Sequence, residues 1–431
     1  MFSSRIDTIN LDKLPFASSS SSQQKHASKP QTITLEWNSD GTRLAYSKND
    51  KSVRIVKFEH GRFNATQPMI IEEAHDKPVG SINWDPKLTS RFVTVARDST
   101  VHCWDVHGHT VKLVREFQAN GEHSVNFMVK YSKDGSHLAV GSIDGKITIF
   151  NTQQEFQFEE LITLQLQDQL FEFDWNKASD CILCSLGRGV VEIYRLDSER
   201  PSIYLLQSLQ LTASDITSLR YAKNDKLFAV GTKDSQVQVV DAQELVTVKS
   251  FENYCDQPVG TVDVFPLPKS TSSAGLKRDD PEATLDDSSV SGVLLAITYE
   301  YGSPAVVYST DQDPVKDEPL LKIEECQRSE FLAIARFNPK NYRVIAYNDS
   351  QGDSKILYPG TNGIKNGESR EPVRERRNGG KEDERRSGRD RDLNRERQRE
   401  RERRRDRDGD RDRGRRSIHP YDRDVKRPRL N

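Results

Sequence analysis

Residues 79–104 read VGSINWDPKLTSRFVTVARDSTVHCW and contain three short runs of apolar, β-branched and aromatic residues. The runs Val79–Trp84, Arg91–Ala96 and Val101–Trp104 are separated by polar turn formers, among them Asp85-Pro86 and Asp98. Short runs of this composition, bounded by turn residues, are typical of strands in antiparallel hairpins. A further run at 111–114 completes a predicted unit of four strands.

This unit recurs along the chain, and an aromatic residue ends the first strand of each copy. The seven aromatic anchors are Trp37, Trp84, Tyr131, Trp175, Tyr221, Phe265 and Phe337, at intervals of 47, 47, 44, 46, 44 and 72 residues. A period of this length with four strands per copy is typical of propeller blades. The sequence therefore predicts an all-β fold, a seven-bladed WD-repeat β-propeller over residues 31–360.

The long last interval coincides with an insertion rich in Ser, Asp, Pro and Lys. Residues 266–290 have too few apolar side chains to build a core, so we predict a disordered loop there. Removing these 25 residues returns the interval to 47, the ordinary period. The insertion therefore interrupts blade six and leaves the repeat intact.

Blade seven has only three predicted strands before the repeats stop at Pro359-Gly360. An incomplete blade would leave an unpaired strand edge. Residues 4–11 alternate between apolar and polar side chains, as a strand does. We therefore predict that the N-terminal arm, residues 1–30, supplies the fourth strand and closes the ring.

The charge of the chain divides at the point where the repeats end. The net charge of −2 combines −11 over residues 1–360 with +9 over residues 361–431, which hold 26 basic and 17 acidic residues. A mixed-charge segment of this kind predicts a disordered tail. The tail has two interpretations, a weak and salt-sensitive contact with RNA or a solvated segment that only aids solubility.

Two basic clusters near the C-terminus have the spacing of a bipartite nuclear-import signal. They are formed by Arg415 with Arg416 and by Lys426, Arg427 and Arg429. Such patterns predict nuclear import, although they also arise by chance in arginine-rich tails.

The remaining composition argues against several classes of site. Five scattered cysteines, an odd number, favour a reducing compartment. No signal peptide or membrane span is predicted. The nine histidines are dispersed, and we predict no metal site, no cofactor and no catalytic residue. Cys181 and Cys184 have the spacing of a metal motif, but they lie in a predicted strand without a second pair, so buried structural thiols are favoured.

Four residues of blade two have the types and spacing of the hydrogen-bond tetrad found in WD-repeat blades. They are His75, Thr94, Asp98 and Trp104, with Asp98 six residues before Trp104. A nucleophilic Thr-His-Asp set would use the same residue types. The structural interpretation is favoured, because these side chains should lie between strands and not in a cleft.

Several stretches resemble the WD-repeat subunit of the THO complex, the THO complex subunit 3 family. They include Asn83–Pro86, Phe92–Asp98, Leu138–Asp144, Phe173–Asn176 and Asn338–Lys340. The most specific is VDAQELVTVKSF at 240–251 followed by QPVGT at 257–261, where Val240 and Gln257 replace two tryptophans of the family's pattern. The resemblance covers residues 33–358 and suggests the fungal type of this subunit, with an Arg/Asp-rich C-terminal tail.

The resemblance implies a nuclear complex, THO/TREX, that couples transcription elongation to mRNA packaging and mRNA export. It implies no catalytic residues, partners among the other THO subunits, and indirect association with an RNA helicase and an export adaptor. Without the resemblance, a scaffold in splicing or another ribonucleoprotein-assembly complex is the main alternative, and a chromatin reader is a further one. A propeller enzyme would need convergent titratable residues at the channel mouth, and none is predicted. No small-molecule substrate and no membrane partner are predicted.

Overall fold

The computed structural model describes residues 6–14, 29–59, 62–63, 68–154, 157–222, 226–252, 255–268, 290–311 and 318–359. The chain divides into two units, Met1–Asn362 and Gly363–Asn431, and the second lies wholly outside the described residues. The predicted tail and its basic clusters therefore also lie outside them.

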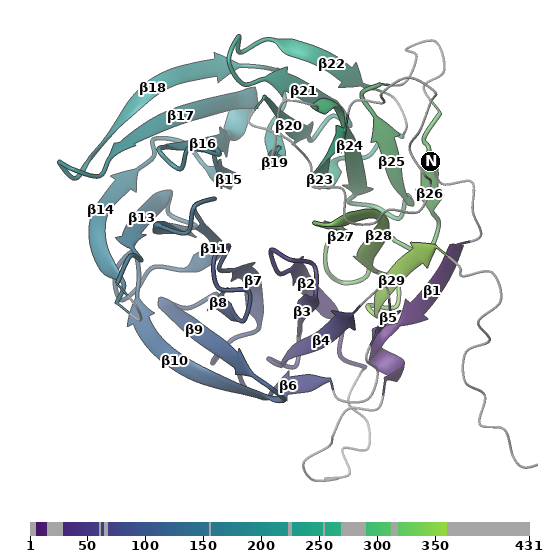
Figure 1. The fold of residues 1–431 in the computed structure, drawn as a ribbon. Helices are drawn as coiled ribbons and strands as arrows, with labels where there is room; N and C mark the ends of the chain where they lie inside the picture. The colour runs from purple at the N-terminus through teal and green to yellow at the C-terminus, as the bar shows by residue number, and fades with distance from the viewer. Residues whose placement is uncertain are drawn as a thin grey trace, which may run out of the picture. The chain divides into compact units, whose positions relative to one another are not determined.

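The first unit is a ring of seven antiparallel sheets arranged as the blades of a propeller (Figure 1). The seven-bladed fold predicted from the spacing of the anchors is confirmed. Blades one to four contain, in order, β2 (Thr32–Trp37), β3 (Arg43–Lys48), β4 (Val53–Glu59) and β6 (Met69–Ile71); β7 (Val79–Trp84), β8 (Arg91–Ala96), β9 (Thr100–His107) and β10 (Thr110–Gln118); β11 (Asn126–Tyr131), β12 (His137–Ser142), β13 (Lys146–Asn151) and β14 (Glu159–Gln165); β15 (Leu170–Trp175), β16 (Cys181–Leu186), β17 (Val190–Asp197) and β18 (Ser202–Gln210).

The other three blades follow the same plan. They contain β19 (Ile216–Tyr221), β20 (Leu227–Thr232), β21 (Val237–Asp241) and β22 (Thr247–Phe251); β23 (Val259–Pro268), β24 (Val290–Tyr299), β25 (Ala305–Ser309) and β26 (Leu321–Ile323); β27 (Ala335–Asn338), β28 (Asn341–Asn348), β29 (Ser354–Pro359) and β1 (Ile6–Asn10). A two-residue strand, β5 (Arg62–Phe63), pairs with the end of β4, and two short 3-10 turns are η1 (Leu11–Lys13) and η2 (Gly187–Gly189).

The burial pattern of a strand depends on its position within the blade. The second strands β8, β12 and β16 are buried at every residue, because neighbouring blades cover both faces of the sheet. The outermost strands β10 and β18 are mostly exposed, with a few half-buried residues. Blade two therefore extends further than its sequence predicted, since β10 reaches Gln118 and not residue 114.

The first turn of two blades uses glycine for a backbone shape that other residues rarely adopt. Gly41 and Gly135 follow an aspartate and have φ angles of 71° and 65°. Positive φ at a hairpin position is the reason that Asp-Gly predicts a turn. At Gly41 a Cβ atom would also collide with Asn338 of blade seven, so the turn is packed against its neighbour.

The N-terminal strand closes the ring, as predicted from the incomplete seventh blade. β1 pairs antiparallel with β29, with Ile6 opposite Pro359 and Asn10 opposite Lys355. Leu11 follows directly and is fully buried between blades one and seven. Residues from the two ends of the described chain thus share one sheet (Figure 1).

In blade six, the first strand extends into the segment that was predicted to be the insertion. Residues 266–268 continue β23, with Leu267 opposite Gly292, and residues 269–289 lie outside the described residues. Pro266 and Pro268 are tolerated because β23 is the innermost strand, and its free edge needs no backbone donors.

Candidate functional site

Six of the seven anchors donate a hydrogen bond to the preceding blade. Three anchor tryptophans donate their indole N–H to a backbone oxygen of the preceding blade: Trp37 to Arg336 (3.3 Å), Trp84 to Glu36 (3.0 Å) and Trp175 to Lys130 (3.2 Å). Three other anchors donate their backbone N–H to a side chain of the preceding blade: Tyr131 to Asn83 (2.8 Å), Tyr221 to Asp174 (2.9 Å) and Phe337 to Asp263 (2.8 Å). The aromatic period therefore reflects a repeated contact between blades.

The residue before each anchor lies on the other face of its strand, because successive side chains of a strand alternate between faces. These seven residues are Glu36, Asn83, Lys130, Asp174, Arg220, Val264 and Arg336. Six of them are polar, and they meet around the axis of the ring, where the first strands of all blades converge (Figure 1). The centre of the ring is therefore the place where polar side chains from different blades can act together.

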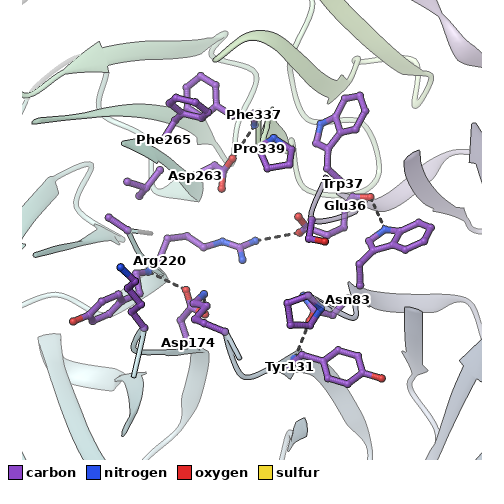
Figure 2. A pocket seen from close by; sticks show the side chains of 18 of the residues that line it. Glu36, Trp37, Asn83, Tyr131, Asp174, Arg220, Asp263, Phe265, Phe337 and Pro339 are labelled. Atoms are coloured by element: carbon purple, nitrogen blue, oxygen red, sulfur yellow. Dashed lines mark hydrogen bonds and ion pairs between the residues drawn. The ribbon is translucent and has the colours of Figure 1, made fainter. Parts of the chain in front are cut away.

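A cavity of about 430 Å³ opens at one end of this channel (Figure 2). We call this end the first-turn end, because it is formed by the turns between the first and second strands of the blades. Every anchor except Trp175 lines the cavity, together with Pro86, Pro266 and Pro339. The volume is within the range of about 300–1,000 Å³ that is usual for ligand pockets, and the walls combine aromatic, polar and charged side chains.

Ion pairs cross the floor of the cavity from blade to blade. The closest contacts join Lys130 to Glu172 (3.0 Å), Lys133 to Asp174 (2.8 Å), Arg220 to Glu36 (3.5 Å), Arg336 to Glu36 (3.6 Å) and Arg220 to Glu172 (3.8 Å). We refer to these seven residues as the channel-mouth cluster. Although burial opposes it, the positive charges of Lys130 and Lys133 hold the pKa of Asp174 far below its usual range. The carboxylate of Asp174 therefore stays ionised and paired with these lysines.

Arg220 differs from the other members of the channel-mouth cluster. Its side chain extends from blade five across the cavity toward Glu36 of blade one (Figure 2). Its Nε is buried without a hydrogen-bond partner, as is the Nε of Arg336. Although burial opposes it, the charges of Glu172, Glu36, Asp263 and Asp174 raise the pKa of Arg220. Burial and the nearby charge of Arg220 together lower the pKa of Arg336. Two guanidinium groups therefore share the single carboxylate of Glu36.

The structure brings His75, Thr94, Asp98 and Trp104 together at the opposite end of blade two. The imidazole Nδ1 of His75 lies 3.3 Å from Asp98 Oδ2, and its Nε2 lies 2.8 Å from Thr94 Oγ1, which also accepts from Trp104 Nε1 at 2.9 Å. Because the carboxylate can only accept, Nδ1 of His75 carries a proton that points to Asp98. The imidazole is fully buried between strands. This geometry fits a structural tetrad and leaves no room for a substrate at the threonine.

In blade three, different residues make the hydrogen bonds of the corresponding region. Asn120 donates to the carbonyl oxygen of Val140 at 3.1 Å and to Asn126 at 2.9 Å, and it accepts from Thr148 at 2.8 Å. Its amide therefore replaces the imidazole of blade two. This substitution explains how the repeat loses its signature residues while the blade remains closed.

The two cysteines with metal-motif spacing lie on opposite faces of β16, as their spacing in a strand predicted. Cys181 packs in the core toward blade five and Cys184 in the core toward blade three. Burial raises the pKa of Cys181 to about 12 and that of Cys184 further. Among the described residues, no group of three or more potential metal ligands occurs, and no helix is long and apolar enough to cross a membrane.

Sequence reasoning missed the channel-mouth cluster. Its members come from five different blades and share no sequence motif. The available signal was positional, since Glu36, Lys130, Asp174, Arg220 and Arg336 all stand one residue before an anchor. Charged residues at that position of an innermost strand must point into the ring. The predicted import signal, Arg415, Arg416, Lys426, Arg427 and Arg429, lies outside the described residues.

The ring of seven sheets, its repeat and its tetrad define the chain as a WD-repeat β-propeller. A family model for "WD domain, G-beta repeat" matches residues 66–105 and 111–151, and one for the "Anaphase-promoting complex subunit 4 WD40 domain" matches residues 173–263. The crystal structure of the Cps50 (Swd1) β-propeller domain of Myceliophteria thermophila has a TM-score of 0.57 over 78% of this chain and 99% of that one, at 13% identity. This likeness concerns the fold alone.

Among named proteins, the chain is similar to THO complex subunit 3 of Arabidopsis thaliana. The two are 29% identical over 251 residues, which cover 58% of this chain and 74% of that protein. It is also 23% identical to WD repeat-containing protein AAC3 of Dictyostelium discoideum over 267 residues, 57% of this chain and about half, 54%, of that protein. The first similarity agrees with the family resemblance seen in the sequence motifs.

Proposed function

We propose that this protein is a non-catalytic scaffold subunit of a nuclear THO-like complex that couples transcription elongation to mRNP assembly and mRNA export. The single observation that carries the proposal is the 29% identity to THO complex subunit 3, which extends over 74% of that protein. The propeller supports it, because folds of this kind usually present rigid surfaces to protein partners.

The chemistry of the channel mouth supports a binding role over catalysis. A general acid or base needs a pKa near the working pH. Here burial is outweighed by the charges of Lys130 and Arg220, which lower the pKa of Glu172, and Asp174 is lowered further. Both carboxylates are thus held as permanent anions in ion pairs. They are suited to fixing the positions of neighbouring blades.

Charge also suggests which macromolecules each part of the chain meets. Residues 1–360 carry −11, which suits protein partners better than the phosphate backbone of RNA. We expect direct contacts with other THO subunits and only indirect association with an RNA helicase and an export adaptor. Any RNA contact would be weak and would involve residues 361–431, which also hold the proposed import signal.

Affinity purification of the tagged full-length chain from nuclear extract tests this function. We expect large THO subunits to co-purify in stoichiometric amounts, resistant to RNase. A matched chain ending at residue 360 should retain them if supplied to the nucleus with a separate import signal, because the propeller carries the contacts. Recovery of splicing or other ribonucleoprotein-assembly factors without THO subunits would replace the proposal with its alternative.

A further inference from the structure

The outermost strand of blade four ends its sheet with an open edge. β18 pairs with β17 on one side, and among the described residues no further strand pairs with its other side (Figure 1). With nine residues each, β18 and β10 are the longest of the outermost strands. An open edge presents unpaired backbone N–H and C=O groups to any chain that approaches it.

The sequence of β18 lacks the charges that usually protect such an edge. Native edge strands often carry charged side chains, which discourage pairing with another chain. The outermost strands of five or more residues in four other blades follow this rule, with Lys112, Arg115 and Glu116 in β10, Glu159 and Glu160 in β14, Lys249 in β22, and Asp7 in β1. The sequence of β18, SIYLLQSLQ, contains no charged residue.

A second protective feature, a β-bulge, is shared by β18 and β10. The pairing register skips Leu206 in β18 and Val114 in β10, and the residues just before the bulge are Leu205 and Leu113. A bulge twists an edge strand but leaves its arms able to pair. The two strands therefore match in length and bulge position and differ in charge, so β10 can serve as the control for β18.

Three consecutive apolar side chains are exposed in the middle of β18. Tyr204, Leu205 and Leu206 are each about half exposed. Because successive side chains of a strand alternate between faces, this apolar surface lies on both faces of the sheet. A helix or loop packed on one face would leave the other face exposed. An added strand lies in the plane of the sheet and can cover both.

The net charge of the ring indicates that the added strand comes from another protein. Residues 1–360 carry −11, so two copies of the ring repel each other. An uncharged segment of a different chain meets no such repulsion. Its side chains beside Tyr204 and Leu205 should be apolar, because β18 offers no charge that could pair with a charge on the segment.

We propose that β18 binds an extended, uncharged and apolar segment of a partner protein, which pairs with its open edge as a fifth strand of blade four. Backbone hydrogen bonds hold the segment, and contacts with Tyr204, Leu205 and Leu206 select its apolar side chains. The inference rests on the protein-binding role proposed above but not on which complex the chain joins. It assigns the outer edge of blade four to partner recognition.

A selection from a displayed library of random 12-residue peptides against the full-length chain tests the proposal. We expect the enriched peptides to contain an uncharged run rich in β-branched and aromatic residues. Two forms of the best peptide are then N-methylated at alternate residues, because alternate N–H groups of a paired strand face opposite sides. The form that loses the N–H groups facing β18 should bind at least about tenfold more weakly, and the other form should bind within about twofold of the original.

Two matched variants locate the binding edge. Leu205→Lys places a charge on β18 and should raise the dissociation constant of the best peptide at least about tenfold, because it removes an apolar contact and opposes pairing. Leu113→Lys makes the same change at the equivalent residue of β10 and should leave binding unchanged. The two side chains are 48% and 45% exposed, so both variants should fold, and their melting temperatures check this.

Three results would overturn the proposal. One is an equal affinity of the best peptide for the original chain and for Leu205→Lys. Another is an equal effect of the two N-methylated forms, which would mean that side chains alone hold the peptide. The third is a dimer of the full-length chain in sedimentation experiments that Leu205→Lys dissociates, which would assign the edge to a second copy. The peptides are selected without any THO subunit, so failure here would leave the proposed scaffold function standing.

Discussion

Two clusters of buried charge in this ring are built differently. In the ring-closure cluster, Lys48 of blade one is fully buried, and its ammonium donates to Asp12 at 2.5 Å and to the carbonyl oxygen of Gly352 at 3.0 Å. Asp12 also accepts from Arg54 at 3.1 Å and from the backbone of Ser354 at 2.9 Å. In the channel-mouth cluster, Arg220 lines a cavity, and its guanidinium lies 3.5 Å from Glu36 and 3.8 Å from Glu172.

The difference separates charges that hold the fold from charges that line a cavity. Burial lowers the pKa of Lys48, and the charge and hydrogen bonds of Asp12 oppose that shift. A buried ion whose hydrogen bonds are all made inside the chain stabilises one arrangement of the blades. Variants of the ring-closure cluster should therefore cost the most stability.

The largest loss of stability should come from the ring-closure cluster. Asp12→Ala leaves the ammonium of Lys48 buried without its carboxylate, and such a change costs about 3–5 kcal/mol of unfolding free energy. Urea denaturation followed by tryptophan fluorescence measures it. Lys13→Ala, at the adjacent exposed residue, should change stability by less than about 0.5 kcal/mol. Equal stabilities for the two variants would show that the N-terminal segment does not close the ring in solution.

A somewhat smaller loss should follow from the tetrad of blade two. Thr94→Val keeps the shape of the side chain but removes the acceptor of Trp104 and the partner of His75. We expect the unfolding free energy to fall by about 2–3 kcal/mol, because two buried polar groups lose their partner. The control is Thr110→Val, whose hydrogen bond is exposed; a matching loss there would contradict a buried tetrad.

A smaller effect should follow from pH. His102 stacks on His75 at 3.8 Å, and burial followed by the charge of His75 lowers its pKa. As pH falls, His102 is therefore protonated in the unfolded chain before it is protonated in the folded chain. The stability that comes from neutral His102 is present above about pH 6.5 and is lost as pH falls below it. Urea midpoints at pH 7.5 and 5.5 should differ, and His102→Gln should reduce the difference. An unchanged difference in the variant would assign the pH dependence to other groups.

The sequence predicted the parts of the fold that rest on repeated contacts. The anchors were visible because most of them donate a hydrogen bond to the preceding blade, and β1 was visible because blade seven lacked a strand. The four residues proposed as a tetrad in blade two were selected by a spacing that follows from strand and turn lengths, and their structural role stays a prediction. The extension of β23 through Pro266 and Pro268 was missed, because proline usually ends a strand unless the strand has a free edge.

The channel-mouth cluster could not be predicted with the same reasoning. Arg220 and Glu36 belong to blades five and one, and their contact depends on how far a side chain reaches across the ring. Lys48 and Asp12 meet for a similar reason, since ring closure brings blade one beside the N-terminal segment. Local pattern locates such residues on strands but does not pair them.

The structure of the tagged chain with the partners that co-purify from nuclear extract tests the central claim most directly. The account predicts that large THO subunits contact the propeller of residues 31–360. A complex in which other ribonucleoprotein-assembly factors are bound to the ring, and no THO subunit is, would contradict it.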